Sequence, residues 1–245
     1  MQNSYGDAQR AAAYAKLEFP GTYALAYRDL PDIINKHASG RKAVDVGCGT
    51  GRSTRFLRQL GFDVIGVDIA EEMIQQAREK DPQGEYRLIH DGALSKVSWH
   101  AYDLALSVFT FDNIPTMEKK VTLFKEMGNL LNNEGRIVNL VSSPGIYTHE
   151  WASFSTKDFP ENLTAKSGDT VKIIITDIED ARAVEDVLWS DEAYHEVFNR
   201  SGLEVIASYK PLAGEDEPYL WVNETRIAPW VIYVLKNAEN TASRA

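Results

Sequence analysis

Residues 44–51 read Val-Asp-Val-Gly-Cys-Gly-Thr-Gly, an apolar run that ends in three glycines at alternate positions. The run at 42–46 is predicted to be a buried strand. Residues 52–60 place their apolar side chains on one face of a helix that Gly61 ends. Glycine lets a chain turn tightly and lets a ligand approach the backbone closely. The segment therefore predicts a strand–loop–helix unit whose loop contacts a ligand.

Strand and helix signals alternate along the chain after this loop. The apolar pattern predicts strands at 63–67, 86–89, 103–108 and 136–141, helices at 70–80 and 116–131, and a turn at 132–135. A helix capped by Ser190 and two strands, 203–209 and 231–235, complete the series. Strands spaced by helices favour right-handed crossovers. The sequence therefore predicts the α/β class, with a doubly wound, mainly parallel sheet.

Two segments interrupt this rhythm and set the expected domain boundaries. Residues 1–40 hold two short helical stretches and are predicted to be an N-terminal helical lid. Residues 142–189 are polar and aromatic at first, and then contain two runs, 171–176 and 182–189, that resemble an antiparallel pair. We expect this segment to be an inserted substrate-lid lobe, with 41–141 and 190–236 forming the main domain.

Composition excludes several classes of protein. The chain of 245 residues carries a net charge of −10, which disfavours a nucleic-acid partner. It has no apolar run of the roughly 20 residues that a membrane span needs and no secretory h-region at its N-terminus. Its single cysteine, Cys48, cannot form an internal disulfide. We therefore expect a cytoplasmic protein, monomeric or homodimeric, with a small-molecule partner.

The acidic residues around the glycine loop indicate which nucleoside it would bind. Asp68 lies 21 residues after Gly47, at the end of the second strand, where a carboxylate reaches the ribose of a bound nucleoside. A nicotinamide dinucleotide would need a glycine where this chain has Arg52. Asp45, inside the strand, would repel a pyrophosphate and favour the ammonium of an amino acid. The pattern favours a nucleoside linked to methionine.

With these residues the chain resembles the Rossmann-like S-adenosylmethionine-dependent methyltransferases, and most closely their small-molecule type 11 branch. The resemblance rests on Asp45-x-Gly47-x-Gly49-x-Gly51, Asp68-Ile69, Asp91-Gly92 and Tyr102-Asp103-Leu104. It covers about residues 40–141 by motif, and 190–236 by strand order only. It implies seven strands with an antiparallel last strand, S-adenosylmethionine as cofactor, and transfer of its methyl group to a small molecule by direct displacement.

The resemblance also implies roles for individual residues. The three loop glycines would wrap the methionine and ribose, Asp68 would accept from both ribose hydroxyls, and Ile69 and Met73 would line the adenine. Asp91 and Gly92 would read the adenine edge, and Ser107 would face the sulfonium and the acceptor. Each of three residues also has a purely structural interpretation: Asp68 as a helix cap, Asp91 as an Asx-turn residue, and Cys48 as a packed loop residue.

The acceptor site is less well defined by the sequence. His149 is the candidate base because imidazole titrates near neutrality, although a surface histidine is at least as good an interpretation. Asp112 and Asn113 would orient a polar acceptor or cap the next helix. In the N-terminal segment, Tyr27 would contact the methionine carboxylate or the acceptor, and Arg28 would pair with that carboxylate.

Two further observations narrow the reaction. The stretch Ser107-Val108-Phe109-Thr110 lacks the Pro-Pro-aromatic run of enzymes that methylate nucleic-acid bases. Ser142-Ser143-Pro144 supplies no carboxylate after the fifth strand, so no catalytic metal is expected. Two alternatives to a methyltransferase stay open: a non-catalytic S-adenosylmethionine-binding or partner-binding module, and a nicotinamide-dependent oxidoreductase.

Overall fold

The apolar runs of the sequence form a seven-stranded sheet in the order β3-β2-β1-β4-β5-β10-β9. The computed structural model describes residues 21–90, 93–179 and 182–238. The strands of this sheet are β1 (Lys42–Val46), β2 (Asp63–Asp68), β3 (Glu85–Leu88), β4 (Tyr102–Val108), β5 (Leu131–Ser142), β9 (Leu203–Tyr209) and β10 (Trp230–Asn237). β10 runs antiparallel to both of its neighbours, while the other pairs are parallel. The predicted sheet, with its antiparallel last strand, is confirmed.

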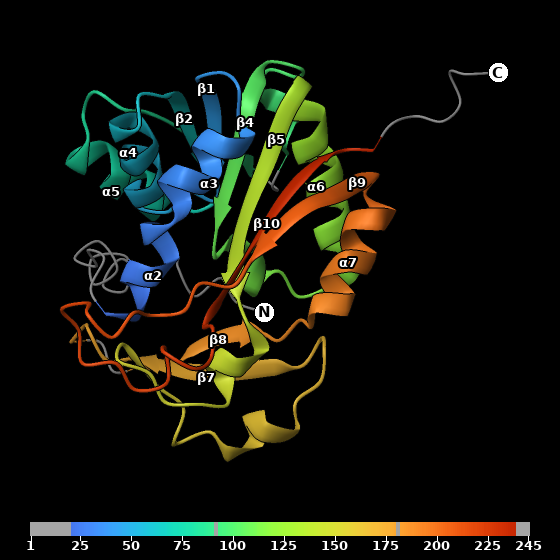
Figure 1. The fold of residues 1–245 in the computed structure, drawn as a ribbon. Coiled ribbons are helices and arrows are strands. Elements are labelled where there is room, and N and C mark those ends of the chain that lie inside the picture. Colours follow the sequence, from blue (N-terminus) through green and yellow to red (C-terminus); the bar gives the residue numbers. More distant parts are fainter. Residues whose placement is uncertain (1–20, 91–92, 180–181, 239–245) are drawn as a thin grey trace.

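Helices cover both faces of the sheet, as its parallel strands require. The helices are α2 (Thr22–Arg28), α3 (Leu30–His37), α4 (Arg52–Gln59), α5 (Glu71–Lys80), α6 (Met117–Leu130) and α7 (Asp191–Arg200). One apolar core packs α2 and α3 against one face of the sheet, and a second packs α6 and α7 against the other. Figure 1 shows these two groups on opposite sides of β4 and β5.

Strand β5 begins earlier than the sequence predicts. It starts at Leu131, and its register against β4 jumps from the pair Tyr102–Leu131 to the pair Leu104–Arg136. The residues predicted as a turn, 132–135, therefore form an irregularity inside the strand. The side chain of Asn132 holds this irregularity in place: its amide donates to the Asp103 carboxylate at 2.7 Å, and its oxygen accepts from the Glu134 amide at 3.0 Å.

The segment after β5 builds a second, smaller sheet from β6 (Phe154–Ser155), β7 (Thr170–Ile175) and β8 (Val184–Val187). β7 pairs antiparallel with β8, as the two apolar runs predict, and also with β6. Figure 1 shows β7 and β8 beyond the carboxyl ends of β4 and β5. Apolar residues of both strands, Val171, Ile173, Ile175 and Val184, join the core that also holds α2.

A buried carboxylate fixes α2 to the rest of the molecule. Glu224 is 0% exposed, and its Oε1 accepts from the Thr22 hydroxyl at 2.6 Å and from the Ala152 amide at 2.7 Å. Its Oε2 accepts from the amides of Val222 and Asn223 at 2.8 and 3.0 Å. Four donors thus satisfy one buried carboxylate, which joins the first turn of α2 to the segment just before β6 and to the segment before β10.

We expect Glu224→Gln to lower the free energy of unfolding by about 1–3 kcal/mol, because its amide group would face at least one of these donors. Urea denaturation measures the change. Glu215→Gln is the matched control, since Glu215 is exposed in the same segment. Equal unfolding midpoints for the two variants would show that the buried carboxylate does not hold α2.

Candidate functional site

In the glycine loop after β1, the backbone at Gly47 and Gly49 has a positive φ, a conformation that favours glycine. Gly47 has φ +74°, and a Cβ at this position would lie 2.1 Å from the Thr110 hydroxyl oxygen. Gly49 has φ +51°, and a Cβ there would have no atom within 4 Å. The first glycine therefore lets the loop pass close to the residue after β4, while the second faces open space.

Gly51 is predicted to wrap the methionine and ribose with the other two glycines, but in the structure it packs against β3. It is the left-handed residue before α4, with φ +80°, and a Cβ there would lie 2.6 Å from the Tyr86 hydroxyl oxygen. Gly51 thus packs against the ring of a β3 residue, and it is not among the residues that line the cavity described below. Its absent side chain serves the contact between the loop and β3.

Asp68 links the ends of β1 and β2. Its Oδ2 accepts from the Gly49 amide at 2.8 Å, and its Oδ1 accepts from the Ala70 amide at 2.9 Å. A carboxylate has about four lone-pair sites, so these two hydrogen bonds leave acceptor capacity for a ligand. Burial raises the pKa of Asp68, and hydrogen bonds from the amides of Ala70, Gly49 and Ile69 oppose this. Asp68 therefore lies on the wall of the cavity described below and also supports the turn before α5.

Asp45 lies beneath the loop. It is 0% exposed, and its Oδ2 accepts from the hydroxyls of Ser53 and Thr54, both at 2.6 Å. Burial raises the pKa of Asp45 to about 6. Its Oδ1 has no hydrogen-bond partner among the described residues. The structure therefore places Asp45 behind the cavity wall, where it holds the first turn of α4.

Cys48 is a packed loop residue rather than a nucleophile. Its side chain is 4% exposed, and burial raises the pKa of the thiol well above its usual value. A thiol with a raised pKa stays protonated at neutral pH, and the thiolate is the reactive form.

A continuous cavity of about 760 Å³ opens at the carboxyl ends of the strands. At one end its wall holds Gly47, Gly49, Asp68, Ile69 and Met73. At the other end it reaches the smaller sheet, where the wall residues are Tyr147, Phe154, Ile173, Ile175, Val184 and Asp186. The structure thus brings the predicted loop residues and the segment after β5 to one hollow, beyond the strand ends as expected for an open parallel sheet.

The predicted residues Ile69 and Met73 differ in exposure. Ile69 is 58% exposed although it is apolar, whereas Met73 is 4% exposed and packs against Ala70. An exposed isoleucine on a cavity wall is a surface that a flat apolar ligand would cover. Asp91 and Gly92 lie outside the described residues.

Helix α2 contributes Tyr23 and Tyr27 to the cavity wall, and Arg52 of α4 lies beside them. The Arg52 guanidinium carbon is 5.2 Å from the ring centroid of Tyr23 and 5.3 Å from that of Tyr27. Burial raises the pKa of Tyr27. A guanidinium over two aromatic faces is held in place and still offers donors to an anion.

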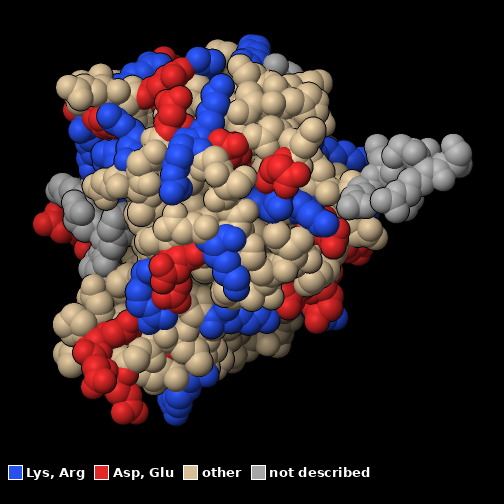
Figure 2. All heavy atoms as spheres, turned by 45° about the horizontal axis from the view of Figure 1, so that its top comes forward, with Lys and Arg blue, Asp and Glu red and all other residues tan. Residues whose placement is uncertain are grey.

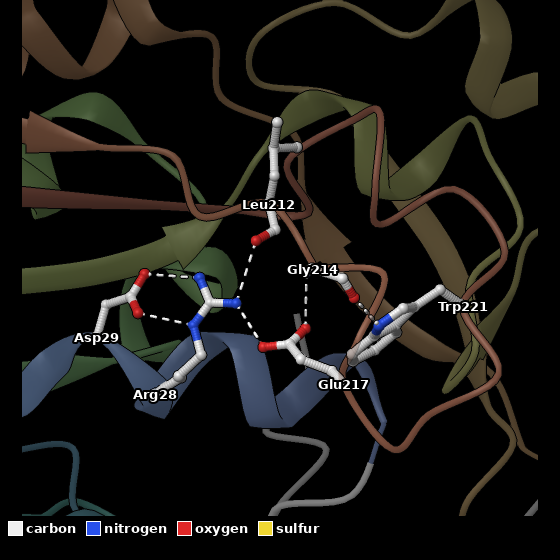
Figure 3. A network of polar contacts seen from close by, with 6 residues as sticks. All are labelled: Arg28, Asp29, Leu212, Gly214, Glu217 and Trp221. Atoms are coloured by element: carbon white, nitrogen blue, oxygen red, sulfur yellow. Dashed lines mark hydrogen bonds and ion pairs between the residues drawn. The ribbon is translucent and has the colours of Figure 1, made fainter.

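Arg28 points away from this wall. Its guanidinium forms an ion pair with Asp29, and it also donates to the Glu217 carboxylate at 2.6 Å and to the Leu212 carbonyl at 3.1 Å. Figure 3 shows the guanidinium directed at the segment that carries Leu212 and Glu217. The structure therefore gives Arg28 a contact that ties α2 to that segment, and does not bring it to the cavity.

Two other predicted residues also lie off the cavity wall. His149 is held by its own turn, where Nδ1 is 3.0 Å from the Gly145 carbonyl and 3.0 Å from the Thr148 hydroxyl. Ser107 is 0% exposed within β4, and its hydroxyl has no partner among the described residues. Neither side chain is among the residues that line the cavity.

A pair of buried carboxylates lies on the wall instead. Asp112 is in the short 3-10 helix η3 (Thr110–Asn113), and it accepts from the Ser142 hydroxyl at 2.8 Å and the Ser142 amide at 3.1 Å. Asp186 of β8 accepts from the Tyr147 hydroxyl at 3.0 Å. Burial first, and then the charge of Asp186, raise the pKa of Asp112. The sequence signal for Asp186 was a carboxylate at an inward position of a short strand, two residues after the buried Val184.

Within the described ranges, no group of three or more His, Cys, Asp or Glu side chains is arranged to hold a metal ion.

The central part of the chain is similar in sequence to known methyltransferases. Residues 44–139 match the family model described as a methyltransferase domain. A ubiquinone biosynthesis O-methyltransferase from Methylococcus capsulatus is 34% identical over 89 residues, which are 34% of this chain and 38% of that protein. An uncharacterized methyltransferase from Bacillus cereus is 34% identical over 113 residues, which are 46% of this chain and 51% of that protein. The matched region thus spans about half, or less, of these relatives.

Solved structures resemble the chain over most of its length. The CcbJ methyltransferase from Streptomyces caelestis superposes with a TM-score of 0.63 and 16% identity, covering 91% of this chain and 100% of that one. An S-adenosylmethionine-dependent methyltransferase from Clostridium acetobutylicum gives a TM-score of 0.61 and 13% identity, covering 92% and 94%. At these identities the likeness establishes the fold. Residues 44–139 therefore match a methyltransferase domain, and the chain has the fold of solved S-adenosylmethionine-dependent methyltransferases.

Proposed function

We propose that this protein transfers the methyl group of S-adenosylmethionine to a small-molecule acceptor by direct displacement. The observation that carries the proposal is the single cavity that runs from the glycine loop and Asp68 to the smaller sheet. Donor and acceptor would lie in this one hollow, side by side. The methyl group of a sulfonium is already activated, so the protein's main task is to align the two reactants and to exclude water.

The residues at the loop end fit the cofactor. The free lone pairs of Asp68 would accept from two ribose hydroxyls, and the open face of Gly49 would let the ribose and methionine approach the backbone. The exposed side chain of Ile69 would pack against the adenine. These three features, all on the wall of one cavity, support the cofactor assignment from this chain's own residues.

We assign the methionine carboxylate to Arg52 and Tyr27 rather than to Arg28. Arg52 lies on the cavity wall, over the rings of Tyr23 and Tyr27, whereas Arg28 is engaged by Asp29 and Glu217. A guanidinium recognises a carboxylate through paired hydrogen bonds, and the aromatic faces beside it favour its charge. Asp45 would act indirectly, by holding the first turn of α4 through Ser53 and Thr54.

The surface and the cavity favour a small acceptor. On the face shown in Figure 2, Lys and Arg are interspersed with Asp and Glu rather than gathered into one basic surface. Nucleic-acid partners depend on such a surface. In the part of the chain that the structure describes, none of the helices combines the length and the apolar character needed to span a bilayer.

We expect the protein to bind S-adenosylmethionine and S-adenosylhomocysteine with micromolar dissociation constants, which correspond to about −8 kcal/mol. Isothermal titration calorimetry measures both, and NAD is the comparison ligand because its pyrophosphate would lie against a loop backed by Asp45. Tight binding of NAD without any response to the two sulfur nucleosides would overturn the proposed function.

We expect Asp68→Ala to weaken S-adenosylhomocysteine binding at least tenfold. Hydrogen bonds to a charged group contribute about 1.5–3 kcal/mol each, and two ribose hydroxyls would lose their acceptor. Asp63→Ala is the matched control, because Asp63 lies at the exposed, opposite end of the same strand. Titrations are performed below the melting temperatures of both variants, since Asp68 also accepts from Gly49 and Ala70. A dissociation constant equal to that of the control would make Asp68 a turn residue only.

A further inference from the structure

The end of the cavity beyond the glycine loop is an apolar chamber between the main sheet and the smaller one. Its wall includes the rings of Tyr23, Phe109, Phe154 and Trp230 and the side chains of Ile173 and Val184. The rings contact one another: Phe109 and Trp230 have centroids 4.7 Å apart, and Tyr23 and Phe154 5.0 Å apart. A chamber of this kind takes an apolar molecular body.

Polar groups converge on one side of this chamber from four elements. Asp112 comes from η3, Ser142 from the end of β5, Tyr147 from the 3-10 helix η4 (Pro144–Tyr147) and Asp186 from β8. All four residues line the cavity. Asp112 and Asp186 are only 5% and 7% exposed. A ligand in the chamber would therefore meet two carboxylates that are largely withdrawn from bulk water.

A lysine whose charge interacts with this pair does not lie on the cavity wall. Lys120 is 0% exposed, its ammonium donates to the Phe111 carbonyl, and it lies 5.0 Å from the ring centroid of Trp189 and 5.3 Å from that of Tyr194. Burial lowers the pKa of Lys120 although Asp112 and Asp186 oppose this. The lysine therefore neutralises the two acids only in part.

A buried tyrosine also interacts with these two acids. The Tyr194 hydroxyl is in a side chain that is 2% exposed, and it has no hydrogen-bond partner among the described residues. Burial first, and then the charges of Asp112, Tyr233 and Asp186, raise the pKa of Tyr194. Tyr194 is not among the residues that line the cavity, and it packs in the core with Phe198 and Tyr233.

We propose that this chamber binds the methyl acceptor as an apolar molecule that carries a protonatable amine, with its nitrogen against Asp112 and Asp186. The inference rests on the proposed function, since it names the acceptor class of the same cavity. An ammonium gains two charge-assisted hydrogen bonds here. A carboxylate or phosphate would be repelled, and a neutral alcohol would gain less from the same two acids.

The transfer step balances with these groups. The ammonium gives one proton to the carboxylate of Asp112, which frees the nitrogen lone pair. That lone pair forms the new bond to the methyl carbon, and the carbon–sulfur bond breaks with its electron pair going to sulfur. The products are the methylated ammonium and S-adenosylhomocysteine. The raised pKa of Asp112 suits it to accept the proton.

The test uses matched triads of ligands: 2-phenylethylamine, 2-phenylethanol and phenylacetate, and hexylamine, hexanol and hexanoate. Each compound is titrated calorimetrically into the full chain saturated with S-adenosylhomocysteine, so that binding is measured without turnover. We expect the amine of at least one triad to bind tenfold or more tightly than its alcohol, with the acid weakest. Equal binding within both triads, tighter binding of an alcohol or acid, or no binding of either amine would overturn the inference.

Asp186→Asn tests the assignment to the acid pair. We expect it to abolish the preference for the amine over the alcohol while leaving S-adenosylhomocysteine affinity within twofold. Asp177→Asn is the matched control, because Asp177 is exposed in the same part of the chain. Loss of amine preference in both variants, or in neither, would contradict the assignment. Thermal melts check that the variants are folded, and Tyr147→Phe offers a second, uncharged route to disturb Asp186.

Separate results would refute the methyltransferase function and the amine acceptor class. Failure of the wild-type protein to bind S-adenosylhomocysteine would refute the proposed function. Titrations of the triads without the nucleoside would still show whether the chamber prefers the amine. Binding of S-adenosylhomocysteine without any amine preference would refute the acceptor class alone.

Discussion

The hydrogen bond from the Gly49 amide to the Asp68 carboxylate joins the carboxyl ends of β1 and β2. The same carboxylate accepts from the Ala70 amide and so fixes the start of α5. Below it, Asp45 fixes the start of α4 through Ser53 and Thr54. Asp68, on the cavity wall, and Asp45, buried beneath the loop, thus hold the two ends of the glycine loop in place. The end of the cavity that we propose for the cofactor depends on the contacts of these two acids.

The end of the cavity that we propose for the acceptor depends on contacts between residues far apart in the sequence. The chain leaves β5 at Ser142, and it returns to the main sheet only after β8 and the helix that Ser190 caps. Within that excursion it places Tyr147 and Asp186 opposite Asp112 at the end of β4. Glu224 then holds α2 against the same region through Thr22 and Ala152. Contacts between residues far apart in the sequence therefore close the chamber around its two carboxylates.

Much of the main sheet could be predicted because its signals are local. Buried parallel strands give short apolar runs, and the glycines at 47 and 49 have conformations that other residues rarely adopt. The place of Asp68 at the carboxyl end of β2, beside the loop, could also be predicted, because the second apolar run ends there. The start of β5 could not be predicted, because its register against β4 depends on how Asn132 contacts Asp103.

The acceptor side resisted prediction because side-chain direction there is set by tertiary contacts. His149 and Arg28 have suitable chemistry in a suitable segment, yet Gly145 and Thr148 hold the first, and Asp29 and Glu217 hold the second. Asp186 and Trp230 reach the cavity from distant parts of the chain, and no local pattern connects them with Asp112. Gly51 has a left-handed backbone, but its absent side chain makes room for Tyr86 of β3 and not for the cavity.

A crystal structure of the protein with bound S-adenosylhomocysteine would test this view most directly. We expect the ribose hydroxyls to lie within about 3 Å of the Asp68 carboxylate, a hydrogen-bond distance. The adenine would lie on Ile69, and the sulfur would face the chamber that holds Asp112 and Asp186. A nucleoside bound elsewhere, or one whose sulfur points away from that chamber, would contradict it.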